Sequence, residues 1–126
     1  KINYLKGQVK FLLSFSKNYK YSYSKKLVYK YKNFFNFRVI GMGGSILGAK
    51  AIFYFLNHKI KKNFFFIDNL QNRIDLKKNK KSFVNLVISK SGNTLETISN
   101  ANILIKKNNK NIFIIENKNN YLNNLI

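Results

Sequence analysis

The sequence contains no cysteine and no proline, and only six of its 126 residues are glycine. Without cysteine the chain can form neither a disulfide framework nor a thiolate metal site. No apolar run reaches the ~18 residues that a membrane-spanning helix needs, and no signal peptide is visible. We therefore expect a cytoplasmic protein that has no membrane partner.

Acidic residues are also scarce, since four Asp and Glu stand against 24 Lys and Arg, for a formal charge of +20. Such a charge favours a polyanionic partner. However, only two of the basic residues are Arg, which proteins prefer for forked contacts to phosphates and bases. Lysine is abundant together with Asn, Ile, Phe and Tyr, whose codons are rich in A and T. We attribute the charge to genome composition and expect no specific nucleic-acid binding, only a general attraction for small anionic substrates.

Hydrophobic residues make up 45% of the chain, enough for a folded core. Short apolar runs predict buried strands, and longer amphipathic segments predict helices. The expected strands are 37–40, 64–67, 84–88 and 112–115, and the expected helices between them are 45–56 and 94–105. This alternation predicts a three-layer α/β/α sandwich with a parallel sheet. Residues 1–35 are expected to be a helical lead-in, and residues 36–126 a domain truncated at its C-terminal end.

Each expected helix has an apolar stripe that should face the sheet. In the first helix the predicted stripe is Leu47, Ala51, Ile52 and Phe55, and in the second it is Leu95, Ile98, Ala101 and Ile105. The polar residues Thr97, Asn100, Asn102 and Lys106 lie off the second stripe.

Four of the six glycines gather in segment 41–48 (GMGGSILG), between the first expected strand and helix. Ligands bind at the carboxyl ends of strands in open parallel sheets, and a helix N-terminus there can hold an anion. The segment fails two common phosphate motifs, because the dinucleotide motif needs glycine in place of Ile46 and the P-loop needs lysine in place of Ala49. A turn that serves packing alone remains an alternative, and Asp68 keeps a dinucleotide site open.

The second polar turn is segment 89–97 (SKSGNTLET), which follows a buried strand and opens a helix. Its Ser and Thr hydroxyls and its turn amides are donors for phosphate oxygens, and Lys90 adds a positive charge. An ordinary helix cap would explain Asn93 and Glu96 as a near capping box, but not the four hydroxyl residues together. Two such turns at the ends of parallel strands favour one shared anion site.

Glu96 needs a separate interpretation, because a carboxylate is repelled by phosphate. It could cap the helix, form an ion pair with Lys90, or lie at the sugar end of a substrate. The residues alone leave these alternatives open.

Segment 39–51 (VIGMGGSILGAKA) resembles the first glycine motif of the glucose-6-phosphate isomerases, and segment 88–97 (ISKSGNTLET) resembles their second. Both motifs lie in the first sugar isomerase (SIS) domain, which is flavodoxin-like. The resemblance covers about residues 36–116. The second motif also occurs with variations in other SIS proteins, whereas segment 47–51 (LGAKA) favours the glucose-6-phosphate branch.

The resemblance implies a reversible conversion of glucose 6-phosphate and fructose 6-phosphate through an enediolate, by a homodimer without metal or cofactor. It implies that Glu96 lies near the reaction centre, as the one catalytic candidate in the chain. The residues implied to bind the substrate phosphate or support its binding are Gly44, Ser45, Ser89, Lys90, Ser91, Gly92, Asn93, Thr94 and Thr97. The general base, the ring-opening histidine and the C-terminal lysine of the family find no counterpart in this sequence. We therefore expect these 126 residues alone to bind substrate without turning it over.

Three other functions remain possible from the sequence. The chain could belong to another SIS phosphosugar isomerase or amino-sugar enzyme, to a non-catalytic SIS module that binds sugar phosphates, or to a protein whose lysine-rich surface binds polyanions. A glutamate-bearing motif in a second SIS domain would favour the isomerase, and an upstream DNA-binding domain would favour the non-catalytic module.

Overall fold

The computed structural model describes residues 14–20, 23–70, 82–106, 110–116 and 119–125. It divides into two compact units, Lys1–Lys32 and Asn33–Ile126. The first unit contains the helix α2 (Lys25–Lys30), where the hydroxyl of the N-cap residue Ser24 accepts a hydrogen bond from the Leu27 amide at 3.3 Å. Residues 1–13 of the expected helical lead-in lie outside the described residues.

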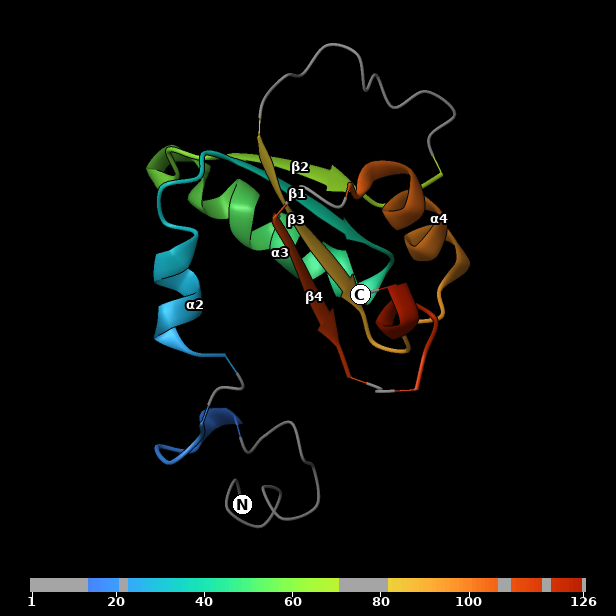
Figure 1. Ribbon diagram of the computed structural model, residues 1–126. Coiled ribbons are helices and arrows are strands. Elements are labelled where there is room, and N and C mark those ends of the chain that lie inside the picture. Colours follow the sequence, from blue (N-terminus) through green and yellow to red (C-terminus); the bar gives the residue numbers. More distant parts are fainter. Residues whose placement is uncertain (1–13, 21–22, 71–81, 107–109, 117–118, 126) are drawn as a thin grey trace. The chain divides into compact units, whose positions relative to one another are not determined.

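The second unit is built on a four-stranded sheet in which every described pairing is parallel (Figure 1). The strands are β1 (Asn36–Gly41), β2 (Asn63–Ile67), β3 (Phe83–Ser89) and β4 (Lys110–Ile115), in the order β2-β1-β3-β4. Each strand forms where an apolar run predicted it. This is the flavodoxin-like strand order. The sheet grows from β1 to β2 on one side and then continues from β1 to β3 on the other side. Open parallel sheets bind their ligands at such a switch point.

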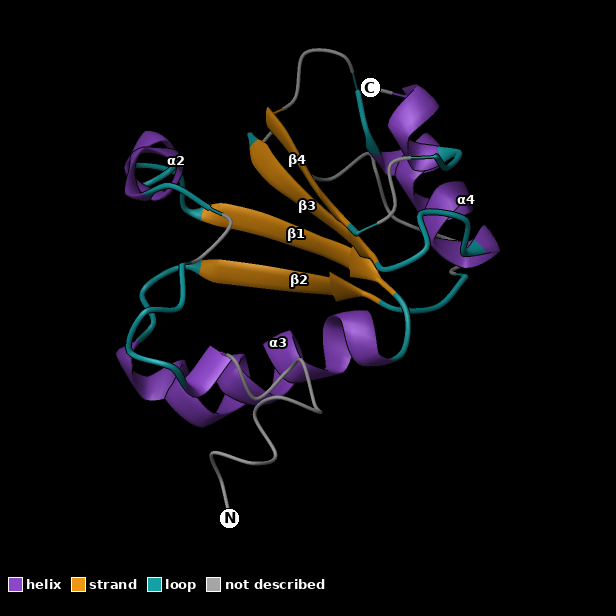
Figure 2. Cartoon of the chain, turned by 90° about the horizontal axis from the view of Figure 1, so that it is seen from below, coloured by secondary structure: helices purple, strands orange, loops and turns teal. Residues whose placement is uncertain are grey.

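Two α-helices complete the layers, with one on each face of the sheet (Figure 2). Helix α3 (Gly44–Leu56) follows β1, and helix α4 (Leu95–Leu104) follows β3. Two short 3-10 helices, η2 (Asn57–Lys59) and η3 (Leu122–Leu125), follow α3 and β4. The predicted α/β/α sandwich with a parallel sheet is confirmed.

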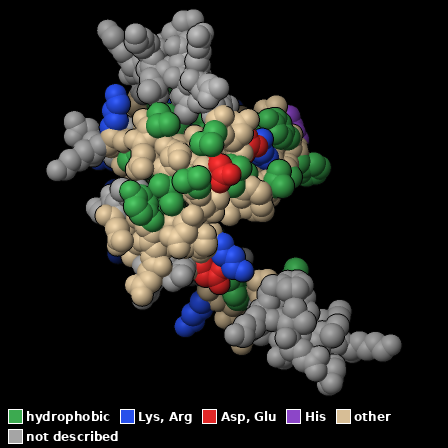
Figure 3. All heavy atoms as spheres, turned by 90° about the vertical axis from the view of Figure 1, so that its right-hand side faces the viewer, with side chains coloured by type: hydrophobic (Ala, Val, Ile, Leu, Met, Phe, Trp, Pro, Cys, Tyr) green, Lys and Arg blue, Asp and Glu red, His purple; other side chains and the backbone are tan. Residues whose placement is uncertain are grey.

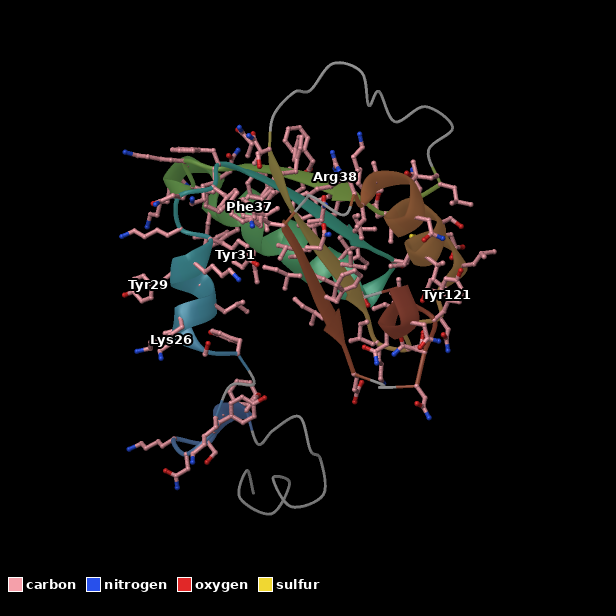
Figure 4. All side chains as sticks on the ribbon, in the orientation of Figure 1. Lys26, Tyr29, Tyr31, Phe37, Arg38 and Tyr121 are labelled. Atoms are coloured by element: carbon pink, nitrogen blue, oxygen red, sulfur yellow. The ribbon has the colours of Figure 1, made fainter. Side chains whose placement is uncertain are left out.

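The two faces of the sheet are filled by different side chains, because neighbouring residues of a strand point to opposite faces. On the α3 face, Phe37 stacks on Phe64 with ring centroids 5.1 Å apart, and Phe53 of α3 lies 5.4 Å from Phe64. Phe37 and its neighbour Arg38 are labelled on β1 in Figure 4. The core on the α4 face consists of Ile40, Ile67, Val87, Ala101, Leu104 and Leu122.

Arg38 occupies the amino-terminal end of the α4 face. Its Nη1 donates to Asn85 Oδ1 at 3.3 Å and to the Leu104 carbonyl, the last residue of α4, at 3.4 Å. The guanidinium carbon lies 4.3 Å from the centre of the Phe83 ring, and burial lowers the pKa of Arg38 from its usual value. Because a cation at a helix C-terminus is favourable, Arg38 has a structural role at the end of the strands that lies opposite the glycine and serine turns.

The predicted buried face of α3 is wrong. Leu47, Ile52 and Phe55 are 59%, 62% and 79% exposed, whereas Ile46 is fully buried. Apolar residues surround much of this helix, and the sheet covers only the stripe that contains Ile46 and Phe53. Ile46 and Phe53 are seven residues apart and therefore lie on the same side of the helix. The sequence was compatible with this stripe as well as with the predicted one, and only this stripe packs against the sheet.

The prediction for α4 is wrong at Leu95, which is 69% exposed. Thr97 and Asn100, which lie off the predicted stripe, are 1% exposed. The Asn100 side chain donates to the Asn69 carbonyl at 3.0 Å, so its burial is compensated by a hydrogen bond. Ala101 is buried and Ile98 packs against the core, as predicted.

Candidate functional site

The two polar turns leave the sheet side by side, because β1 and β3 are neighbours. Gly41, the last residue of β1, pairs with Ile88 of β3. A Cβ on Gly41 would lie 2.8 Å from the Ile88 carbonyl oxygen, which is closer than a real side chain tolerates. Glycine therefore lets the strands run together to their carboxyl ends, where both turns begin.

An open cavity of about 470 Å³ lies between these turns. Its lining residues are Ser45 from the first turn, Lys90, Ser91 and Thr94 from the second, and Glu116, which follows β4. The structure thus brings together four residues that the sequence assigned to one anion site. Three hydroxyl residues and one lysine therefore line the same space.

The first turn presents the N-terminus of α3 to this region. Gly43 is the N-cap residue with φ 52° and ψ −129°, a conformation that favours glycine. The amide of Ser45 donates to the Met42 carbonyl at 3.1 Å. Within the described residues the Gly44 amide has no hydrogen-bond partner, and a Cβ on Gly44 would meet nothing within 4 Å. Gly44 is exposed, but it does not line the cavity.

The second turn is shaped by its own serines. The Ser89 hydroxyl accepts a hydrogen bond from the Gly92 amide at 3.0 Å, and the Ser91 hydroxyl accepts one from the Asn93 amide at 3.2 Å. Ser89 is 3% exposed and Gly92 has φ 71°. Neither Ser89 nor Gly92 lines the cavity, so the structure places them behind the turn surface, where they fix its shape.

The helix cap lies one residue later than predicted. Thr94 is the N-cap of α4, and its carbonyl accepts the Ile98 amide at 3.0 Å. The side chain of Thr94 makes no capping bond, so its hydroxyl is available to the cavity. Asn93, the predicted cap, instead accepts the Tyr121 amide through Oδ1 at 2.9 Å. This long-range contact displaces the predicted capping box.

Thr97 lies one turn further along α4. Its Oγ1 is buried and has no hydrogen-bond partner among the described residues. Leaving a buried hydroxyl unpaired costs about 1–3 kcal/mol. The buried Thr97 hydroxyl, next to the turn that carries Thr94, therefore lowers the stability of the fold.

Glu96 does not line the cavity. It stands in the first turn of α4, where a negative charge is favoured by the helix dipole. In the described part of the chain it forms no ion pair with Lys90. Of the three roles considered for Glu96, neither the predicted capping box nor the Lys90 pair is formed.

Asp68 has a different partner from the one that a dinucleotide site would require. Its carboxylate forms an ion pair with Lys50 of α3, and both side chains are about one quarter to one third exposed (26% and 30%). This pair ties α3 to the end of β2. The position of Asp68, which had left a dinucleotide site possible, is thereby explained by a structural ion pair.

Glu116 is the lining residue that sequence reasoning missed. It directly follows β4, whose carboxyl end lies at the same edge of the sheet as the two turns. Its position directly after the fourth apolar run was the sequence signal that could have placed it at the site. Because it lines the same cavity as Lys90, its carboxylate lowers the net positive charge there.

The face of the molecule in Figure 3 shows no large basic patch among the described side chains. On the face shown in Figure 3, Lys and Arg side chains lie in separate small groups, with acidic side chains beside some of them. Among the described residues no group of three or more His, Cys, Asp or Glu side chains could hold a metal ion. None of the helices in the described ranges has the length and apolarity to span a bilayer.

Comparison with curated proteins finds relatives that are named glucose-6-phosphate isomerases. The chain is 48% identical over 85 residues to a glucose-6-phosphate isomerase of Methanocaldococcus jannaschii, a match that covers 62% of this chain and 21% of that protein. This stretch of the chain is similar to glucose-6-phosphate isomerases. A protein of the same name from Borrelia garinii subsp. bavariensis is 38% identical over 90 residues, which cover 60% of this chain and 16% of that protein.

The similarity has clear bounds. The chain spans about a fifth or less of the length of these glucose-6-phosphate isomerases. No family model matches the chain, and no solved structure matches it.

Proposed function

We propose that this chain forms the phosphate-binding part of a glucose-6-phosphate isomerase. The observation that carries the proposal is the single cavity lined by hydroxyls from both polar turns together with Lys90. The similarity to curated glucose-6-phosphate isomerases supports the same function. Glucose 6-phosphate and fructose 6-phosphate are the proposed substrates, and the proposed setting is a cytoplasmic homodimer.

In this proposal the cavity holds the phosphate dianion through hydrogen-bond donors and Lys90, although the Glu116 carboxylate in the same lining offsets part of the positive charge. Ser45 and Thr94 donate from opposite turns, while Lys90 supplies a charge-assisted bond. The N-termini of α3 and α4 add the positive ends of two helix dipoles. These contacts position the sugar without taking part in bond breaking.

The chemistry itself moves one proton between C1 and C2 of the opened sugar. A base removes the proton from the carbon next to the carbonyl to give an enediolate, the hydroxyl proton passes between the oxygens on C1 and C2, and the base returns its proton to the other carbon. The binding contacts to the phosphate hold the reacting carbons within reach of that base. We propose that Glu96 lies toward the sugar end, as the one catalytic candidate in the chain, and that other groups of the assembled enzyme complete the reaction.

The proposal is tested by isomerase assays on the full-length protein that carries this chain, with Ser45→Ala and Thr94→Ala as separate variants. Each change should raise the KM for fructose 6-phosphate about tenfold, because a hydrogen bond to a charged group contributes about 1.5 kcal/mol or more. The kcat should change less than the KM, since the phosphate is remote from C1 and C2. Thermal unfolding should be nearly unaffected, because neither hydroxyl forms a hydrogen bond with another of the described residues.

The matched control is Ser82→Ala, an exposed serine that precedes β3 at the opposite end of the strand. It should leave both kinetic constants unchanged. A full-length protein that does not interconvert the two hexose phosphates would refute the proposed activity. Unchanged KM values in both variants would refute the assignment of the phosphate to this cavity.

A further inference from the structure

Gly92 at the centre of the second turn is covered by a side chain from the C-terminal segment. Its backbone has φ 71°, and a Cβ added there would overlap the Asn120 side chain, with Asn120 Cβ only 2.7 Å away. Asn120 is 7% exposed. The turn and Asn120 therefore pack so closely that only glycine fits between them.

Two backbone hydrogen-bond donors from the same segment reach the turn. The Tyr121 amide donates to Asn93 Oδ1 at 2.9 Å, and the Leu122 amide donates to the Gly92 carbonyl at 3.3 Å. The segment lies beside the turn after β3 at the C-terminal end of the chain, and Figure 4 labels Tyr121 within it. Both acceptors belong to residues that sit between the cavity-lining Ser91 and Thr94.

The segment is itself anchored at two points. Leu122 is fully buried and belongs to the core on the α4 face. Asn120 Oδ1 accepts a hydrogen bond from the Asn123 amide at 2.8 Å. This bond caps the start of the short helix η3. The contacts on the turn are thus connected to the core through Leu122, within two residues of Asn120.

We propose that segment 120–122 is a brace that holds the second turn in the shape required to bind phosphate, and that Asn120 is its positioning residue. This inference rests on the function proposed above. Asn120 does not line the cavity, so it acts through Gly92 and Asn93 on the placement of Ser91 and Thr94. The two serine bonds within the turn hold its backbone locally, and the brace adds contacts from outside the motif that fix where the turn lies relative to the core.

The test uses the full-length protein, with Asn120→Ala as the first variant. We measure the affinity for inorganic phosphate by calorimetry and the kinetic constants with fructose 6-phosphate. Both the phosphate Kd and the KM should rise about tenfold, because a small displacement of binding groups has a large effect on affinity. The kcat should stay within about twofold, a split between KM and kcat that general loss of stability would not produce.

A second variant pair keeps the inference testable if Asn120→Ala unfolds the segment. Gly92→Ala should weaken phosphate binding strongly, since the new Cβ overlaps Asn120. Adding Asn120→Gly should recover part of that affinity by removing the overlap, so the two changes should be non-additive. The matched control is Asn124→Ala, an exposed asparagine of the same short helix, which should leave binding unchanged.

The outcomes separate this inference from the proposed function. If the unmodified protein does not bind phosphate or isomerise fructose 6-phosphate, the proposed function is wrong and the brace has no role in it. Suppose instead that the unmodified protein does both and that Ser45→Ala weakens phosphate binding. If Asn120→Ala then binds phosphate normally, the proposed brace is wrong, while the proposed function remains supported. Additive effects of Gly92→Ala and Asn120→Gly would also overturn the brace.

Discussion

Replacing Lys90 by methionine in the full-length protein is expected to raise the KM for fructose 6-phosphate by about 10- to 100-fold, since hydrogen bonds to charged groups contribute about 1.5–3 kcal/mol. Among the residues that the structure describes, Lys90 is the one cationic side chain that lines the cavity, and methionine preserves its apolar stem without the charge. Because Lys90 is exposed, its removal should leave the unfolding temperature nearly unchanged. Steady-state kinetics and thermal unfolding on the same samples measure both effects.

The control for this change addresses the high positive charge of the chain. Lys106→Met also removes one exposed lysine, from a position just after the C-terminal end of α4. If general attraction of anions sets the affinity, both variants should lose the same modest amount and the loss should vanish as salt is raised. A Lys90→Met effect no larger than that of Lys106→Met would contradict a specific phosphate contact.

Gly41→Ala is expected to lower the free energy of unfolding by about 2–4 kcal/mol, in the range of severe overpacking in a core. The new Cβ would lie 2.8 Å from the Ile88 carbonyl oxygen, and backbone at the centre of the sheet cannot move aside without disturbing the β1–β3 pairing. Chemical denaturation of the full-length protein measures the loss. The variant should also bind phosphate more weakly, because both polar turns begin next to this pair of residues.

Gly48→Ala is the matched control, since it makes the same chemical change seven residues later. Gly48 lies within α3, and a Cβ there would meet nothing within 4 Å. Alanine in a helix is more stable than glycine by roughly 0.5–1 kcal/mol, so this variant should be slightly more stable than the unmodified protein. Equal effects at the two positions would show that the close approach of β1 and β3 is not what requires Gly41.

Most of the fold could be predicted from the sequence because its signals are local. Short apolar runs, each followed by glycine or a polar residue, predicted all four strands, and their alternation with helices predicted the parallel sheet. The gathering of Ser45, Lys90, Ser91 and Thr94 around one cavity also follows from local reasoning. Each of them follows a strand, and the carboxyl ends of parallel strands meet at one edge of the sheet.

The remaining features depend on contacts between residues far apart in the chain. The helix pattern could not show which stripe of α3 would face the sheet, because both Ile46 and Leu47 begin apolar stripes. The cap at Thr94 could not be foreseen, since the Tyr121 amide occupies the Asn93 side chain from 28 residues away. The cover of Gly92 by Asn120 has the same origin.

The account depends most directly on where the substrate phosphate binds, and a crystal structure of the full-length protein with fructose 6-phosphate measures that position. We expect the phosphate oxygens within about 3.2 Å of the hydroxyls of Ser45 and Thr94, the normal range for hydrogen bonds, with the Lys90 ammonium beside them. A phosphate bound elsewhere, with this cavity left to solvent, would contradict the account.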